Sequence, residues 1–326
     1  MAIDLEKFIL EATGSKSAEP VQTVQSLWSG YGKLIRYKLS GAEQTSIIVK
    51  HINPPPKPGH PRGFGGDLSH KRKLRSYQVE TLFYKKFAEK CSQSCRVPTL
   101  IASKEEKVER AIILEDLDRA GFSQRLKPRN LEQAGGCISW LADFHAVFLN
   151  TRPDGLWPVG TYWHLGTRPE ELQQLKDKPL KEAASRIDAK LNSAKFQTLL
   201  HGDAKVANFC FADFSRVAAV DFQYTGAGCG MKDLAYLVGS CFDEVFCAKH
   251  EKEILGLYFQ NLKQGIYSRN IDIDFDLLEN EWRALYHVAW ADFHRFLKGW
   301  SPGHWKINDY SERVCQEVIR SLHDFN

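Results

Sequence analysis

Hydrophobic and polar positions alternate over short runs in the first third of the chain. Residues 34–39 (LIRYKL) alternate, residues 45–52 (TSIIVKHI) are rich in β-branched side chains, and the turn sequence GAEQ separates them. This pattern predicts an antiparallel hairpin. Two further runs, 97–103 and 110–117, extend the prediction to a small sheet of about five strands. Residues 3–12 are expected to form a short amphipathic helix, which a polar linker follows.

A segment rich in proline and glycine interrupts the sheet pattern. Residues 53–70 contain five prolines and four glycines, which predicts a long loop. Apolar spacing after the loop predicts a helix over about residues 72–91, with Ser69 or Ser76 as the candidate N-cap. The basic run 71–75 belongs either to a solvated helix face or to a segment that closes over phosphates.

The pattern becomes helical after residue 118. Apolar residues recur at helical spacing over residues 129–150, 180–196, 230–265 and 278–299, and short strand-like runs cover 196–200, 209–211 and 217–222. We therefore predict an α+β fold with two lobes. The N-terminal lobe, residues 1–117, holds an antiparallel sheet with one main helix, and the C-terminal lobe, residues 118–326, is mainly helical.

The composition favours an ordinary globular protein. The chain has 326 residues, of which 43% are hydrophobic and 26% charged, and its formal net charge is +4. This charge is small for the length and predicts no nucleic-acid partner. The eight cysteines form no C-x-x-C pair, which argues against a zinc ribbon or a thioredoxin-like motif. The N-terminus has no signal-peptide pattern and no apolar run approaches a membrane span, so we expect a cytoplasmic protein without a membrane partner.

The stretch LLHGDAKVANFCF, residues 199–211, contains the candidate chemistry. Asp203 and Asn208 are five positions apart, and Asp221 follows thirteen positions later at the end of an apolar run. Phosphoryl transfer needs a carboxylate that accepts the proton of the acceptor hydroxyl, and hard oxygen ligands that hold Mg²⁺ against the nucleotide phosphates. Asp203 suits the first role, and Asn208 with Asp221 suits the second. A plain polar hairpin loop is the simpler alternative.

These motifs resemble those of a known superfamily. HGDAKVAN and VDFQ are similar to the catalytic loop and the metal-binding segment of the protein-kinase-like fold. The run VDFQYTGAG…DLAYLVGSC and the helix SHKRKLRSYQVETLFYKKF resemble the aminoglycoside phosphotransferase and choline kinase group, most of all its ecdysteroid-kinase-like branch. The resemblance covers roughly residues 26–300. It implies a two-lobed protein-kinase-like fold, an ATP-dependent small-molecule kinase, ATP and Mg²⁺ as cofactors, and a hydroxyl acceptor.

The N-terminal residues fit the same scheme. Lys50, on a predicted strand, is placed to reach the α- and β-phosphates, and Glu80 on the following helix could pair with it. Gly30 and Gly32, in SGYGK, either let backbone amides approach phosphate or form a plain turn. The segment ILEDL, residues 113–117, would connect the lobes.

The backbone of this connector, around Glu115 and Leu117, could bind adenine. Lys205 is expected to stabilise charge on the transferring phosphoryl group, although a lysine in solvent is the alternative. His201 is expected to organise the loop, and Asp233 to anchor it or to cap a helix.

The acceptor is not determined by the sequence. The aromatic residues Trp282, Tyr286, Trp290 and Phe293 are spaced along one predicted helix, where they belong either to the core or to an acceptor pocket. Aromatic rings near Asp292 or Glu281 would suit a cation such as choline, or equally a steroid or another apolar alcohol. Choline is not favoured, because choline kinases differ in the metal segment and the catalytic loop. The choice between ATP and GTP and the oligomeric state also stay open.

Two other functions remain as alternatives. A pseudokinase would bind nucleotide without turnover, but the expected catalytic side chains are all present. A protein kinase is less favoured, because Gln223 replaces the glycine of Asp-Phe-Gly and the segment from Tyr224 to Asp233 is too short for an activation segment.

Overall fold

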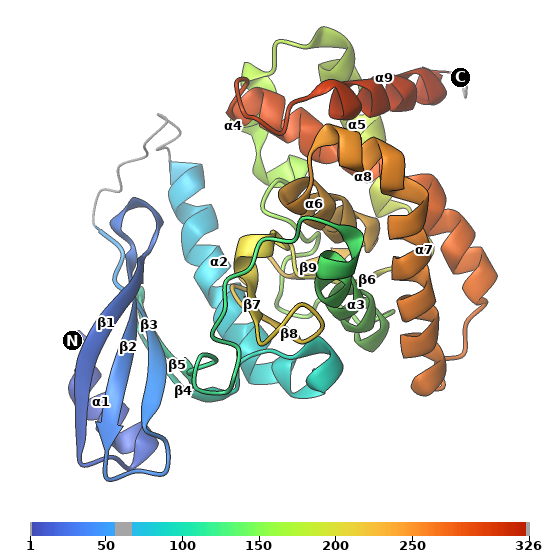
Figure 1. Cartoon of the computed structure of the whole chain (residues 1–326). Coiled ribbons are helices and arrows are strands. Elements are labelled where there is room, and N and C mark those ends of the chain that lie inside the picture. The colour runs from blue at the N-terminus through green and yellow to red at the C-terminus, as the bar shows by residue number, and fades with distance from the viewer. Residues whose placement is uncertain (1, 56–66, 324–326) are drawn as a thin grey trace.

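The computed structural model describes residues 2–55 and 67–323. Within this part of the chain, a five-stranded antiparallel sheet has the strand order β1-β2-β3-β5-β4. Figure 1 shows the sheet at one end of the molecule and most helices at the other, with α2 between them. The strands are β1 (Ser17–Ser26), β2 (Gly32–Ser40), β3 (Ser46–Ile52), β4 (Leu100–Glu106) and β5 (Glu109–Glu115).

The two faces of the sheet have different partners. Helix α1 (Leu5–Thr13) covers one face, where its Ile9 packs with Ile47 and Val49 of β3. Side chains alternate between faces along a strand, so Lys50 and Ile52 of the same strand point to the other face. Ile52 packs there with α2 (Asp67–Lys86). The prediction of a hairpin over residues 34–39 and 45–52 is confirmed, and Lys50 lies on the face that looks toward the helical region.

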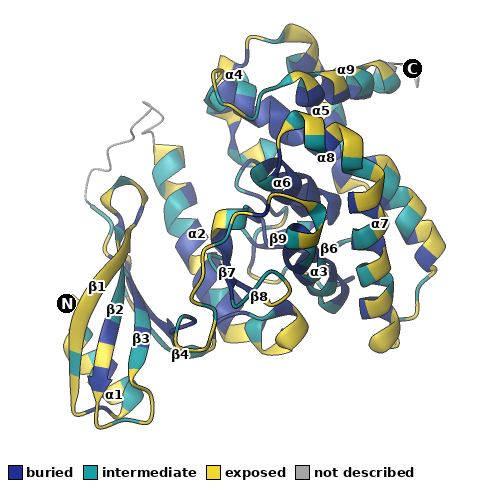
Figure 2. Cartoon of the chain, viewed as in Figure 1, coloured by how far each residue is buried: buried dark blue, intermediate teal, exposed yellow. Residues whose placement is uncertain are grey.

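Strand β1 corrects the expectation of a polar linker after the first helix. Residues Ser17–Ser26 pair with β2 at the edge of the sheet, although nearly every side chain is exposed. Figure 2 shows β1 as a mostly exposed strand. A strand that is exposed to solvent on both faces shows no alternation of hydrophobic and polar residues, so the sequence pattern does not reveal it. Pro20 fits this edge position, because proline donates no ladder hydrogen bond.

Helix α2 also differs in detail from its predicted form. It begins at Asp67, ahead of residue 72, and ends at Lys86 before two short 3₁₀ turns. Neither Ser69 nor Ser76 is its N-cap: both lie inside the helix, and the Ser76 hydroxyl donates to the Lys73 carbonyl. Most of the predicted 53–70 loop, residues 56–66, lies outside the described residues.

The helical region follows the sheet, which confirms the predicted α+β fold. The predicted helix over 230–265 is two helices, because Phe242 is extended and Asp243 caps the second one by accepting from the Phe246 N–H at 2.8 Å. A short helix, a C-terminal helix and one strand were not predicted. The elements are α3 (Leu131–Val147), α4 (Pro169–Gln174), α5 (Lys178–Asn192), β6 (Thr198–Leu200), β7 (Phe209–Phe211), β8 (Val217–Ala219), β9 (Gly226–Gly228), α6 (Met231–Cys241), α7 (Glu244–Ser268), α8 (Phe275–Trp300) and α9 (Asp309–His323).

One hydrophobic core joins the two regions. It runs from Ile52 and Phe83, on the sheet and α2, to Trp140 of α3 and Trp282 of α8. In Figure 2 the segments around α3, α6 and β6 are the most deeply buried. The division into lobes at residue 117 stays a prediction. Within residues 2–55 and 67–323, no helix combines the length and apolar character that crossing a membrane requires.

Candidate functional site

A cavity of about 600 Å³ lies between the sheet and the helical region. This volume falls in the range of small-molecule sites. Eight of the ten predicted site residues line it, from four parts of the fold. The sheet contributes Lys50, α2 contributes Glu80, the connector contributes Glu115 and Leu117, and the loops of the helical region contribute Asp203, Lys205, Asn208 and Asp221.

Asp203 is held through one of its two carboxylate oxygens. Lys205 Nζ donates to Asp203 Oδ2 at 2.8 Å, and Asn208 Nδ2 donates to the same oxygen at 3.1 Å and to the Asp203 carbonyl at 2.8 Å. Asp203 Oδ1 is buried and has no hydrogen-bond partner among the described residues. Such a group is costly to leave unpaired. The carboxylate is therefore oriented and keeps one oxygen free for another proton donor.

Buried hydrogen bonds fix the loop that presents Asp203. Asp233, at the start of α6, accepts from the His201 N–H at 2.6 Å and from the Gly202 N–H at 3.0 Å. His201 accepts at Nδ1 from the Asp203 N–H at 3.2 Å. Gly202 has φ 82°, and a Cβ there would lie 2.1 Å from the Tyr224 carbonyl oxygen, so only glycine fits. The predicted loop-organising roles of His201 and Asp233 are confirmed by these contacts.

The opposite wall carries a buried charge cluster. Lys50 Nζ lies 2.7 Å from Glu80 Oε2 and 3.1 Å from Asp221 Oδ1. The predicted pairing of Lys50 with Glu80 is confirmed. Because the side chains of Lys50 and Glu80 are almost fully buried, the pair fixes the direction of the ammonium toward the cavity.

Burial and the neighbouring charges have opposing effects on the pKa of each group in this cluster. Burial raises the pKa of Glu80 to about 7, against the opposing effect of Lys50. Burial alone would lower the pKa of Lys50, but Asp221 and Glu80 raise it overall. Burial would likewise raise the pKa of Asp221, but Lys50, Lys205 and Lys73 hold it well below its usual range. Lys50 and Asp221 are therefore charged at neutral pH, whereas Glu80 titrates near it.

Asp221 adopts a strained backbone that its neighbours maintain. Its φ is 72°, in the left-handed region, which a non-glycine residue adopts at a cost of about 1–3 kcal/mol. The Gln223 amide Nε2 donates to Asp221 Oδ1, while Gln223 Oε1 accepts from Lys73 Nζ at 2.8 Å. Phe222 stacks on Phe83 of α2, with ring centroids 3.9 Å apart. Helix α2 therefore holds this segment at two points.

Asn208 and Asp221 fit a magnesium ion. Among the described residues, Asn208 donates only through Nδ2, which leaves Oδ1 free, and no hydrogen bond is made to Asp221 Oδ2. Both are hard oxygen atoms, and Mg²⁺ is commonly bound through one or two carboxylates together with substrate phosphates. No group of three or more His, Cys, Asp or Glu side chains suited to a metal occurs in the described ranges, so a magnesium ion here would need phosphate or water as further ligands.

The structure does not place the two predicted glycines on the cavity wall. Trp28, Ser29 and Tyr31 line the cavity instead. Gly30 donates its N–H to the Leu27 carbonyl at 3.2 Å. A Cβ on Gly32 would lie 2.0 Å from the His51 carbonyl oxygen, so this glycine permits the close pairing of β2 with β3. Phosphate binding by this segment stays a prediction.

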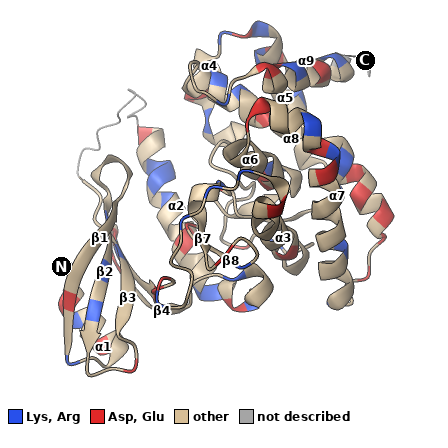
Figure 3. Cartoon of the chain, viewed as in Figure 1, with Lys and Arg blue, Asp and Glu red and all other residues tan. Residues whose placement is uncertain are grey.

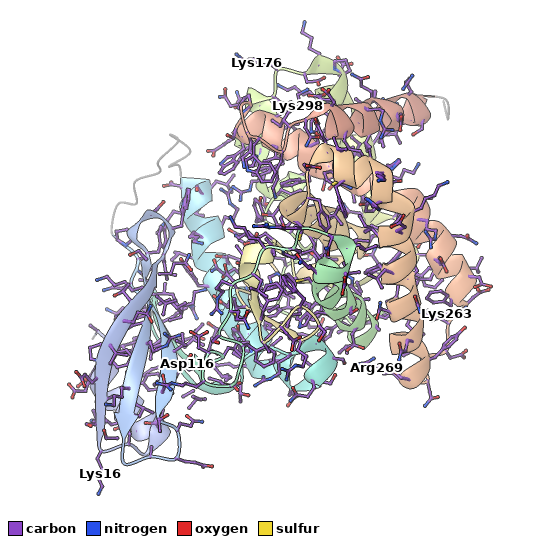
Figure 4. All side chains as sticks on the ribbon, in the orientation of Figure 1. Lys16, Asp116, Lys176, Lys263, Arg269 and Lys298 are labelled. Carbon is purple, nitrogen blue, oxygen red and sulfur yellow. The ribbon has the colours of Figure 1, made fainter. Side chains whose placement is uncertain are left out.

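The connector passes along one side of the cavity. Arg96 Nη2 donates to Glu115 Oε2 at 2.5 Å, so this side chain has a structural partner. Leu117 is buried against Cys210. Asp116, labelled in Figure 4, lies where the chain leaves the sheet, and it accepts from Arg36 of β2 at 2.9 Å. Adenine binding by the backbone of this segment stays a prediction.

The aromatic stripe of α8 belongs to the core. Trp282, Tyr286, Trp290 and Phe293 are all buried, and none of them lines the cavity. Asp292 and Glu281 are also engaged elsewhere. Asp292 pairs with Arg295 at 2.8 Å and with Lys232 at 3.3 Å, and Glu281 accepts from the Lys195 and Phe196 N–H groups. Neither carboxylate is available to a cationic acceptor.

Other residues form the cavity wall on this side. Phe296 and Trp300, one and two turns further along α8, line it together with Tyr162 and Tyr236. Hydrophobic spacing could not separate Phe296 and Trp300 from the four rings of the core, since all six lie on the same helix. Gln223 also escaped prediction as a contact, although its position directly after Phe222 pointed to this segment.

The basic run 71–75 has one face toward the cavity, and closure of this run over phosphates stays a prediction. Figure 3 shows basic residues gathered along the first part of α2. Arg72 and Lys73 line the cavity, where Arg72 Nη1 donates to the Thr167 carbonyl at 2.7 Å. Lys71 is exposed, and Arg75 Nη2 donates to the Gly155 carbonyl at 2.7 Å. One face of the run therefore looks into the site and the other does not.

Comparison with known proteins decides the family. A model of the ecdysteroid kinase-like family matches residues 40–153 and 160–270, which is more than half of the chain. The chain belongs to the ecdysteroid kinase-like family. The resemblance read from the sequence is thereby confirmed, and the family is one of small-molecule phosphotransferases. No curated protein matches the sequence.

Solved structures place this ecdysteroid kinase-like chain in a known fold. A choline kinase from Cryptosporidium parvum Iowa II matches with a TM-score of 0.51 at 10% identity, over 94% of this chain and 89% of that one. A choline kinase, LicA from Streptococcus pneumoniae, matches with a TM-score of 0.47 at 15% identity, over 99% and 100% of the two chains. A thermostable mutant of the aminoglycoside phosphotransferase APH(4)-Ia, in a ternary complex with ADP and hygromycin B, matches with a TM-score of 0.47 at 12% identity, over 98% and 99%. The fold is similar to that of the choline kinase from Cryptosporidium parvum Iowa II.

Proposed function

We propose that this protein is an ATP-dependent kinase that transfers the γ-phosphoryl group to a hydroxyl of a small-molecule acceptor. The observation that carries the proposal is the hydrogen bonding of the two carboxylate oxygens of Asp203. One oxygen of its carboxylate is held by Lys205 and Asn208, and the other is buried, unpartnered within the described residues and part of the cavity wall. A general base needs this arrangement, because its orientation is fixed while one acceptor atom stays free for the proton of the substrate.

The remaining cavity groups match the needs of phosphoryl transfer. Lys50, whose direction is fixed by Glu80, would contact the α- and β-phosphates of ATP. Asn208 and Asp221 would hold Mg²⁺ through their free oxygens. When bound, Mg²⁺ supplies positive charge that neutralises the nucleotide phosphates. Catalysis would then consist mainly of positioning and electrostatic stabilisation.

Lys205 would act on the transferring group as well as on Asp203. Burial would lower its pKa, but the carboxylates of Asp203 and Asp221 raise it, so the side chain is charged at neutral pH. Its Nζ lies 2.8 Å from the proposed base. A cation at that place stabilises negative charge on the phosphoryl oxygens and favours the ionised form of Asp203.

Replacement of Asp203 by asparagine tests the proposal. ATP consumption with Mg²⁺ is measured over a panel of amino alcohols, aminoglycosides, sugars and sterols. Asp203→Asn keeps the shape but cannot accept the proton as a base, so turnover with any acceptor that the wild type uses should fall by about 10²–10⁴-fold. Asp213→Asn is the matched control, because Asp213 lies in a half-exposed turn with Arg216 outside the cavity. Full turnover by Asp203→Asn would refute the role of Asp203.

The same experiment separates the alternatives. A pseudokinase would gain thermal stability from Mg·ATP, because ligand binding stabilises the folded state, but would consume no ATP with any acceptor. A protein kinase would label mixed protein substrates with γ-phosphate. No observation in the cavity favours either alternative over a small-molecule kinase.

A further inference from the structure

The helical side of the cavity contains, besides Asp203, a second polar group with unsatisfied hydrogen-bonding capacity. Lys306 lies in the segment between α8 and α9 and lines the cavity together with Asp203 and Lys205. Its Nζ sits over the rings of Tyr236 at 4.7 Å, Trp305 at 5.5 Å and Phe293 at 5.6 Å from the centroids.

The ammonium of Lys306 has no anionic partner within residues 2–55 and 67–323. Burial lowers its pKa to about 8, while Asp203 opposes the shift and Lys205 adds to it. The side chain is therefore still mostly protonated at neutral pH. A lysine ammonium has three hydrogen-bond donors. Aromatic faces attract its charge but do not provide the acceptor oxygen that a full hydrogen bond needs.

The other cations on this side of the cavity already have oxygen partners. Lys205 pairs with Asp203 at 2.8 Å, and Arg168 pairs with Glu171 at 2.9 Å. Arg72 donates to the Thr167 carbonyl. Lys306 therefore contributes to the cavity, which Asp203 also lines, a positive charge that no described carboxylate pairs with.

Two consequences follow for any acceptor. An acceptor that carries an ammonium group would have to approach aromatic faces that the protein's own ammonium already occupies, and the like charges would repel. An acceptor that carries an oxygen anion would supply the missing partner of Lys306 through a charge-assisted hydrogen bond. The neighbouring rings of Tyr236 and Phe296 would at the same time bury its apolar part.

We propose that Lys306 is a specificity-determining residue, which binds an oxygen anion such as a carboxylate or sulfate on the acceptor and excludes acceptors that carry an ammonium group. This proposal rests on the proposed kinase function, because it assumes that the acceptor hydroxyl lies at Asp203. It names a class of acceptor, an anionic hydroxy compound with an apolar or aromatic body, that the cavity would select.

Three probes of one shape test the charge preference directly. 4-Hydroxyphenylacetate, tyrosol and tyramine share one ring and differ in an anionic, neutral or cationic tail. Their dissociation constants are measured by ligand-observed NMR with the full chain at neutral pH, for the wild type, Lys306→Met and Lys306→Arg. Lys263→Met is the matched control. Lys263, labelled in Figure 4, also lies over aromatic rings, Tyr267 at 5.6 Å and Phe275 at 5.1 Å, but on α7, and it does not line the cavity.

The wild type should bind the anion about tenfold more tightly than the cation, which corresponds to about 1.4 kcal/mol. Lys306→Met should abolish that preference, and Lys306→Arg and Lys263→Met should keep it. Equal binding of anion and cation by the wild type, absence of binding by the anion at its highest soluble concentration, or an unchanged preference in Lys306→Met would each overturn the proposal.

Mg·ATP binding by the same samples separates this proposal from the kinase function. If the probes rank as expected but the wild type neither binds Mg·ATP nor consumes it, the proposed function fails and the role of Lys306 in ligand choice stands. If the wild type phosphorylates an acceptor and Lys306→Met leaves the charge preference unchanged, only the Lys306 proposal fails.

Discussion

Replacement of Lys50 by methionine should make the stability of the protein depend strongly on pH above neutrality. Lys50 is the cation that lies against Glu80, whose side chain is 2% exposed, at 2.7 Å. Breaking a buried ion pair by removing one partner typically costs about 3–5 kcal/mol. Glu80 can avoid most of that cost by taking up a proton, because burial already raises its pKa to about 7.

The sign of the effect follows from proton linkage. The pKa of Glu80 is raised in the folded state relative to the unfolded state, so the folded protein binds the extra proton and its stability falls as the pH rises toward the folded pKa. In the wild type this fall ends near pH 7. Without Lys50 the folded pKa rises further, and the fall continues at about 1.4 kcal/mol per pH unit. Lys50→Met should therefore lose roughly 2 kcal/mol more than the wild type between about pH 7 and pH 8.5.

Urea unfolding at a series of pH values measures this difference. The double variant Lys50→Met/Glu80→Gln is the control, because it has no carboxyl group at position 80 and should show no extra pH dependence. Both variants lose Lys50, the cation that lowers the pKa of Asp221 most, so the difference between them isolates the contribution of Glu80. A destabilisation of Lys50→Met that is constant across the series, or that persists unchanged in the double variant, would refute the reasoning.

Two further predictions concern the sheet and the metal segment. Gly32→Ala should lower the free energy of unfolding by at least about 2 kcal/mol, because its Cβ would lie 2.0 Å from the His51 carbonyl oxygen. Gly30→Ala should lower it by only about 1 kcal/mol, because the space around the new atom is open. Similar losses for the two variants in urea unfolding would contradict this prediction. Gln223→Leu should raise the Mg²⁺ concentration needed for half-maximal ATP turnover by about tenfold, because it removes the amide that orients Asp221, and an unchanged Mg²⁺ dependence would show that the contact is dispensable.

The sequence predicted those elements that combine a hydrophobic pattern with burial. Strand β3 and helices α3 and α8 lie within a few residues of their expected bounds. Strand β1 was missed because its side chains are exposed on both faces, so the pairing with β2 leaves no trace in hydrophobicity. The break between α6 and α7 was present in the sequence as Asp243, a capping residue directly before a helix.

Helix α9 was missed although its pattern was readable. Its buried residues Tyr310, Val314, Cys315 and Val318 repeat at helical spacing. They pack on the helical region from the C-terminal end of the chain, as Figure 1 shows for α9 beside α8. The amino-acid composition of this segment did not distinguish it from the rest of the chain.

The sequence identified most of the predicted site residues that line the cavity, and their catalytic and binding roles stay predictions. Asp203, Asn208 and Asp221 were identifiable because their spacing matches a chemical requirement, and Lys50 with Glu80 because the resemblance assigned them a pairing. Lys306 and Gln223 could not be found in this way. Their roles depend on contacts between segments far apart in the chain, such as Lys306 with Tyr236 and Gln223 with Lys73.

The most direct test of the central claim is to observe the phosphorylated product itself. ³¹P NMR of the wild type with Mg·ATP and an acceptor from the panel should show a new phosphomonoester signal that grows as the γ-phosphate signal of ATP declines. With Asp203→Asn, correctly folded and still bound to Mg·ATP, that signal should grow about 10²–10⁴-fold more slowly. The account is contradicted if the variant forms the phosphomonoester at the rate of the wild type, or if the wild type binds Mg·ATP and forms none with any acceptor class.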